Sequence, residues 1–143
     1  MTVAAQASGE RASATQHLIG AAPLIAEAAR AMAARFRQGG RLLVFGTGRA
    51  ATDAEHVAVE FVHPVIVGKP ALPALTLTAD VATVTGVATG PAPADMFAHQ
   101  LRLLAAPADI AMGISARAGD AVVQRALDVA GSAGLLTVAL VGG

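Results

Sequence analysis

Short apolar runs and helical patterns alternate along most of this chain. The apolar runs suit buried strands and fall at 42–45, 73–78, 110–114 and 135–141. Between them, apolar positions recur three or four residues apart, which predicts helices over about 50–62, 95–104 and 121–133. Near-continuous apolar strands that alternate with helices indicate a parallel sheet covered on both faces. The pattern therefore predicts an α/β fold, a parallel-sheet three-layer α/β/α sandwich of the flavodoxin-like or Rossmann-like kind.

A longer helical pattern precedes the first strand and covers residues 14–36. Its large apolar side chains repeat at intervals of seven and four residues, at Leu18, Ile25, Met32 and Phe36. Pro23 marks either a helix start or a kink. Because the segment is rich in alanine and low in charge, we expect it to pack against its own copy in a homo-oligomer.

Glycine and proline set the other boundaries. Gly39-Gly40 ends the first helix, Pro64 stops the helix that starts near residue 50, and Gly134 caps the last helix. Residues 86–94 are rich in glycine, proline and small side chains, which predicts a loop.

Composition narrows the classes of function. With 143 residues, 55% of them hydrophobic, the chain can bury one core, so we expect a flexible N-terminus at 1–13 and a single domain over 14–143. A net charge of zero and only 3% aromatic residues argue against a nucleic-acid partner. The absence of cysteine excludes disulfides and thiolate metal sites. No apolar run could cross a bilayer and residues 1–11 lack the apolar core of a signal peptide, so we expect no membrane partner and a cytoplasmic location.

A glycine turn between the first strand and the next helix is the most informative local feature. Gly46-Thr47-Gly48 lets the backbone turn tightly and approach a ligand, and the helix that follows points free N–H groups at the same place. A phosphate is the natural occupant, whereas the alternative is a tight connection that binds nothing. A dinucleotide fingerprint would need an acidic residue about twenty positions further on. Asp80 lies too far along, which argues against a nicotinamide cofactor.

His56 and Glu60 lie four residues apart and so share one face of the predicted helix. Such a pair can hold a metal ion, act in acid–base chemistry, or simply belong to the solvated side of the helix. Two side chains cannot hold zinc tightly. A third ligand would come from His63, His99, a neighbouring subunit or further chain.

Three blocks of residues, in this order, carry a family resemblance: 46–60 (GTGRAATDAEHVAVE), 69–80 (KPALPALTLTAD) and 113–115 (GIS). They identify the chain as similar to the sugar isomerase (SIS) domain family, and within it to the phosphoheptose isomerases, from about Leu18 to Val141. The resemblance implies a five-stranded sandwich, a homodimer or homotetramer, and aldose–ketose isomerisation of sedoheptulose 7-phosphate. It also implies zinc held partly by His56 and Glu60, with Glu60, His56 and Asp80 as catalytic residues.

The resemblance also implies that two loops bind the carbohydrate derivative through its phosphate. The matching positions are Gly46, Thr47, Gly48, Arg49 and Ala50 in the first loop, and Ser115, Arg117 and Asp120 in the second. Thr47 replaces a family asparagine, Ala50 a phosphate-binding serine, and Arg117 and Asp120 two further serines.

These departures alter the expected phosphate site. Arg49 and Arg117 can restore attraction to a phosphate, whereas Asp120 would repel a dianion or serve as a helix N-cap. Family members also continue beyond the position of Gly143, through another strand and a helix with further metal and catalytic residues. We therefore expect a chain truncated at its C-terminus.

Two classes of function follow from these features. The first is a sugar-phosphate isomerase with a degraded site, in which Glu60 or Glu55 is the base and a metal at His56 polarises the carbonyl. The second is a non-catalytic SIS protein that acts through protein partners, as relatives that associate with the replication initiator do, or as a sugar-phosphate sensor. The retained His56 and Glu60 favour the first, and the altered loops favour the second.

Overall fold

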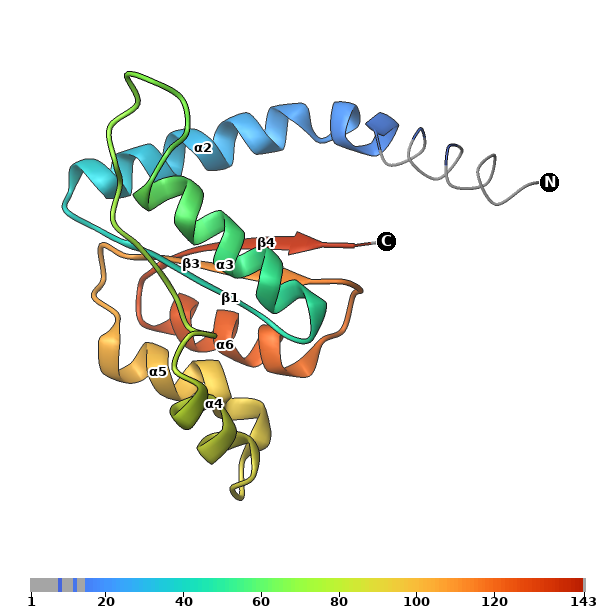
Figure 1. Ribbon diagram of the computed structural model, residues 1–143, viewed down its shortest axis with the longest axis vertical. Coiled ribbons are helices and arrows are strands. Elements are labelled where there is room, and N and C mark those ends of the chain that lie inside the picture. The colour runs from blue at the N-terminus through green and yellow to red at the C-terminus, as the bar shows by residue number, and fades with distance from the viewer. Residues whose placement is uncertain (1–7, 9–11, 13–14, 143) are drawn as a thin grey trace. The chain divides into compact units, whose positions relative to one another are not determined.

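A computed structural model describes residues 8, 12 and 15–142 of the protein (Figure 1). The chain forms two compact units, one ending at Ala31 and one beginning at Met32. In chain order the elements are α2 (Ala22–Arg37), β1 (Leu42–Gly46), α3 (Arg49–Val62), β2 (Ala74–Thr76), α4 (Val81–Ala88), the 3₁₀ helix η1 (Pro93–Asp95), α5 (Met96–Leu104), β3 (Ile110–Ser115), α6 (Ala121–Ser132) and β4 (Leu136–Val141).

The second unit contains a sheet of four parallel strands in the order β2-β1-β3-β4. This confirms the four predicted strands and their parallel direction. The second strand is shorter than its predicted range of 73–78. Leu77 still donates its N–H to Val44, but the N–H of Thr78 turns back onto the hydroxyl of Thr76. That local hydrogen bond ends the strand at Thr76.

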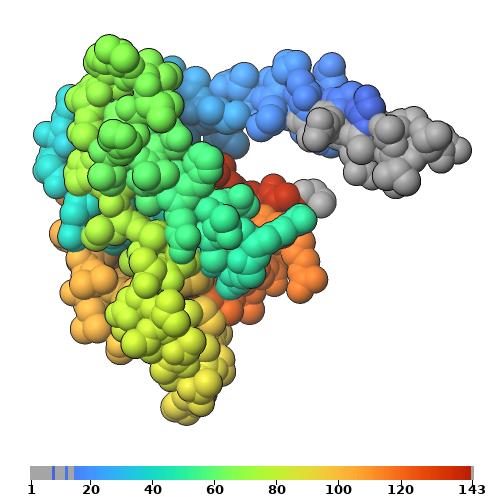
Figure 2. All heavy atoms as spheres, in the orientation of Figure 1, coloured from blue at the N-terminus to red at the C-terminus, as the bar shows by residue number. Residues whose placement is uncertain are grey.

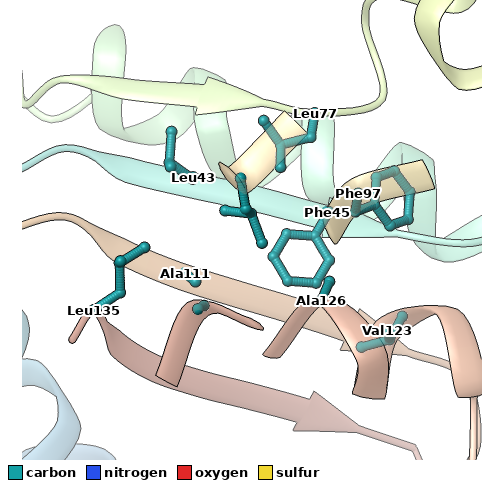
Figure 3. Packing of buried hydrophobic residues seen from close by; sticks show 10 residues of the cluster. Leu43, Phe45, Leu77, Phe97, Ala111, Val123, Ala126 and Leu135 are labelled. Atoms are coloured by element: carbon teal, nitrogen blue, oxygen red, sulfur yellow. The ribbon is translucent and has the colours of Figure 1, made fainter. Parts of the chain in front are cut away.

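Apolar side chains cover both faces of the sheet, as the sequence predicts. Leu43 and Phe45 of β1 point into a cluster with α5 and α6, whereas Leu42 and Val44 point into a cluster with α3 and Met32. Figure 3 shows the first cluster, in which the Phe45 and Phe97 rings lie 5.3 Å apart between their centroids. In Figure 1, α3 and α6 accordingly lie on opposite faces of the sheet.

The predicted helix ends are also confirmed. Gly134 follows α6 with a φ of 83°, and it donates its N–H to the carbonyl of Gly131 while Leu135 donates to Ala130. Gly39 ends α2 in the same left-handed conformation, with a φ of 82°. Only glycine adopts this conformation without steric cost, which is why these positions stop the helices.

The loop predicted over 86–94 is wrong at both ends. Helix α4 runs to Ala88, and Pro93–Asp95 forms a 3₁₀ helix. The valines and threonines of α4, together with Gly86, have low helix propensity, so the sequence pattern does not predict this helix. Its capping residue and the packing of Val84 against the core cluster stabilise it instead.

The N-terminal segment is helical over residues 15–20, turns at Ala21 and continues as α2. Pro23 therefore lies in the first turn of α2, in agreement with the predicted helix start or kink. The flexible N-terminus predicted at 1–13 lies outside the described residues except for 8 and 12, and it stays a prediction. Within the part of the chain that the structure describes, no helix is long and apolar enough to span a bilayer.

Candidate functional site

The strand order places the two predicted ligand loops side by side. The connection after β1 passes through α3 to β2 at one edge, and the connection after β3 passes through α6 to β4 at the other. The chain connections therefore leave the carboxyl ends of the neighbouring strands β1 and β3 in opposite directions, at the point where Gly46 pairs with Ile114. Open α/β sheets bind their ligands at such a point. The loops at 46–51 and 115–120 both open there.

Gly46 is the position at which the first loop needs glycine for space. A Cβ atom there would lie 2.7 Å from the carbonyl oxygen of Ala50 and 2.8 Å from that of Ile114. Both neighbours are backbone atoms, which cannot move aside without opening the turn. Gly48 has a φ of 56°, which favours glycine for a different reason, the left-handed backbone.

The first turn of α3 carries a net positive character. Its N-cap is Gly48, and no side chain caps the helix. The N–H of Ala50 bonds to Thr47 and that of Ala51 to Gly48, so any ligand would meet the preceding turn and the exposed Arg49 first. Arg49 forms no ion pair with any other described residue. Ala50 itself is buried, so its methyl group faces the core rather than the loop surface.

Ser115 ends β3 and is buried, with 5% of its surface exposed. Its hydroxyl donates to the carbonyl of Arg117 at 2.6 Å and accepts from the N–H of the same residue at 3.4 Å. The serine therefore shapes its own loop and leaves the exposed guanidinium of Arg117 at the surface.

Asp120 joins the two loops. One carboxylate oxygen accepts a hydrogen bond from the hydroxyl of Thr47, and the other accepts from the N–H groups of Val122 and Val123 at 3.0 and 3.2 Å. The predicted N-cap role is thus confirmed, and the bond to Thr47 is additional. Burial by itself would raise the pKa of Asp120. The hydrogen bonds and the positive charge of Arg117 outweigh burial, so the pKa lies below its ordinary value.

His56 and Glu60 lie together on the exposed side of α3, with Nε2 and Oε1 3.5 Å apart. Their side chains are 74% and 45% exposed, which suits a solvated pair as well as a ligand contact. At 1.5 Å per residue, His56 lies about 10 Å and Glu60 about 16 Å along the helix from Arg49. Glu60 also lines a cavity of about 300 Å³ with Phe61 and the segment after α3. That segment forms the green surface in Figure 2.

A complete metal site is not formed by the described residues, among which no three histidine, aspartate or glutamate side chains gather. His63 and His99 are exposed, and so is Asp53. Because catalytic zinc takes three protein ligands, His56 and Glu60 do not suffice.

Asp80 lies at the N-terminus of α4, where it accepts hydrogen bonds from the N–H and the hydroxyl of Thr83 at 3.1 and 2.6 Å. The hydroxyl of Thr83, followed by its N–H, lowers the pKa of Asp80. Asp80 is therefore the N-cap of α4.

A polar chain beyond the end of β2 was missed by the sequence reasoning. The hydroxyl of Thr78 donates to Glu55 at 3.2 Å and lies 2.6 Å from the hydroxyl of Thr76. This chain positions Glu55, the alternative base, at the carboxyl edge of the sheet. The alternation of threonine with leucine over 76–78 is the sequence feature that could indicate these hydroxyl contacts, but it is equally typical of the strand predicted over 73–78.

Comparison with known proteins agrees with this architecture. The family model of the SIS domain matches residues 9–142. This chain belongs to the SIS domain family. A phosphoheptose isomerase structure from Francisella tularensis covers the whole chain with a TM-score of 0.86 and 31% identity, and the chain covers 77% of it. The corresponding structure from Neisseria gonorrhoeae has a TM-score of 0.79 and 25% identity, with 96% of this chain and 74% of that one covered.

Curated relatives support the same relationship. The phosphoheptose isomerase of Thermodesulfovibrio yellowstonii is 39% identical over 81% of this chain and 58% of its own length. That of Solidesulfovibrio magneticus is 40% identical over 85% of this chain and 59% of its own length. The SIS domain is therefore related to phosphoheptose isomerase, which confirms the resemblance seen in the sequence. The chain spans somewhat under three fifths of these relatives.

Proposed function

We propose that this SIS domain binds a phosphorylated sugar at the loops 46–51 and 115–120. The observation that carries the proposal is their meeting at the carboxyl ends of β1 and β3, where the strand order diverges. Arg49 and Arg117 supply positive charge at this edge, and a guanidinium can hold a phosphate with two hydrogen bonds. The relationship to phosphoheptose isomerases favours a sugar phosphate over other anions.

Sedoheptulose 7-phosphate should stabilise the protein against heat. Ligand at one hundred times its Kd adds about 2.7 kcal/mol to the free energy of unfolding, which raises the Tm by several degrees. Arg49→Ala should shrink the shift, because the exposed arginine would attract the phosphate. Arg30→Ala, which removes an exposed arginine of α2, is the matched control and should leave the shift unchanged. A protein whose Tm does not respond to any phosphorylated sugar at millimolar concentration would contradict the proposal.

A second candidate function is isomerisation, which the proximity of His56 and Glu60 favours. Isomerisation moves a proton between adjacent carbons and needs a carboxylate base, for which Glu60 and Glu55 are the candidates. A metal ion would polarise the carbonyl. In this proposal zinc binds only in a homodimer or homotetramer, because a third ligand such as His99 would have to come from a second copy of the chain.

Turnover and metal content separate the two functions. In the isomerase case, sedoheptulose 7-phosphate is converted, mass spectrometry finds stoichiometric zinc, and His56→Ala abolishes both. In the case of a sensor or a protein that acts through partners, the sugar phosphate binds without turnover and His56→Ala leaves binding intact. We favour the second result for these 143 residues, because the serine hydroxyls expected at Ala50 and Asp120 are missing.

A further inference from the structure

The positive end of α6 is already occupied by the protein's own carboxylate. Asp120 accepts from the N–H groups of Val122 and Val123 with one oxygen and from the hydroxyl of Thr47 with the other. Both oxygens are engaged, and the two backbone N–H groups that one of them binds are those that a ligand phosphate would otherwise use. The N-terminus of α6 therefore offers a fixed negative charge instead of an anion cradle, and the exposed Arg117 is the positive group of this loop.

The first turn of α3, at the same edge of the sheet, has the opposite character. Its N-cap residue, Gly48, has no side chain, and the exposed Arg49 follows directly. The two helices cover opposite faces of the sheet, and their first turns face the same point of divergence. The site thus has a fixed carboxylate at the first turn of α6, with the exposed Arg117 beside it, and an uncapped first turn followed by a cation on the α3 side.

The carboxylate of Asp120 is ionised at neutral pH, since its hydrogen bonds and Arg117 lower its pKa. An ionised carboxylate only accepts hydrogen bonds. It can accept from sugar hydroxyls, which are donors, but it repels a second phosphate. Its half-buried position strengthens that repulsion relative to bulk water.

We propose that Asp120 makes the site selective for sugars that carry a single phosphate and excludes bisphosphates. The proposal rests on the proposed function, because it assigns the ligand of the same two loops. The phosphate of the ligand lies towards α3, and the hydroxyl-bearing end lies towards Asp120 and Thr47. The sequence predicts that Asp120 either caps a helix or repels a phosphate. In this proposal the capping carboxylate also determines which sugar phosphates bind.

Calorimetric titration with sedoheptulose 7-phosphate and sedoheptulose 1,7-bisphosphate tests this selectivity. The unmodified protein should bind the monophosphate at least about tenfold more tightly, as expected for a like charge a few ångströms from the second phosphate. Asp120→Asn keeps a good N-cap without the charge and should remove most of that preference. Asp120→Ser provides a second capping variant with the same expectation.

Asp128→Asn is the matched control, because it removes the same charge from an exposed position further along α6. Its preference for the monophosphate should equal that of the unmodified protein. If the monophosphate binds but Asp120→Asn and Asp120→Ser keep the full preference, the selectivity proposal is overturned while the proposed function stands. If neither sugar binds to any of the proteins, both are overturned.

Discussion

Replacing Asp109 with alanine is expected to destabilise the protein by roughly 3–5 kcal/mol, as for other broken buried ion pairs. Asp109 is 2% exposed and lies directly before β3. Its carboxylate accepts from the N–H of Arg41 at 2.7 Å, from the Arg41 guanidinium at 2.9 Å and from the N–H of Ala106 at 3.0 Å. Without it, two backbone N–H groups lose their acceptor, and the partly buried guanidinium of Arg41 keeps only its hydrogen bond to the carbonyl of Leu104.

Urea denaturation followed by circular dichroism measures this loss of stability. Asp128→Asn is the control and should change the free energy of unfolding by no more than about 0.5 kcal/mol.

The dependence of stability on acidic pH provides a second measurement. Burial alone would raise the pKa of Asp109, but its hydrogen bonds with Arg41 and Ala106 lower it in the folded protein. The stabilisation is therefore complete above about pH 4, the pKa in the unfolded chain, and is lost as the pH falls further. Asp109→Asn should flatten this acid limb; an unchanged limb would show that the pair contributes little.

Replacing Gly46 with alanine should impair both the fold and the ligand site. The added Cβ would lie within 2.8 Å of the carbonyl oxygens of Ala50 and Ile114, so the turn must open. Overpacking of this kind costs about 1–3 kcal/mol. Opening the turn also moves Arg49 away from the second loop, and we expect the thermal shift with sedoheptulose 7-phosphate to disappear.

Gly86→Ala is the control for this substitution. Gly86 lies inside α4, and apart from the backbone of this helix and the adjacent residues no atom lies within 4 Å of the position of its added Cβ. Alanine there should stabilise the helix by up to about 1 kcal/mol and leave ligand binding unchanged. Equal denaturation midpoints and equal thermal shifts for Gly46→Ala and the unmodified protein would show that the turn tolerates a side chain.

The order of strands and helices could be predicted because each strand is a separate apolar run and each turn has its own glycine or proline. Helix α4 could not, since its valines and threonines favour strands and its stability comes from packing against residues far along the chain. Helix propensity was the wrong guide there, and the cap at Asp80 was the signal that could have corrected it.

In the candidate site, too, local features could be predicted from the sequence and long-range contacts could not. The two loops could be found from the glycine turn and the family blocks, whose residues are adjacent in sequence. The bond between Thr47 and Asp120 joins residues 73 positions apart, and the pair of Arg41 and Asp109 spans 68. Which polar groups meet across the edge of a sheet depends on strand register, and register is fixed only when the whole sheet forms.

Amide NMR of the ¹⁵N-labelled protein during titration with sedoheptulose 7-phosphate tests most directly where the ligand binds. We predict that the largest shifts occur at the backbone N–H groups of 47–51 and 115–120. Unphosphorylated sedoheptulose should produce much smaller shifts at 47–51, because the phosphate supplies the contact with α3. Shifts confined to the cavity beside Glu60 and Phe61, or no shifts at millimolar sugar phosphate, would contradict the proposed site.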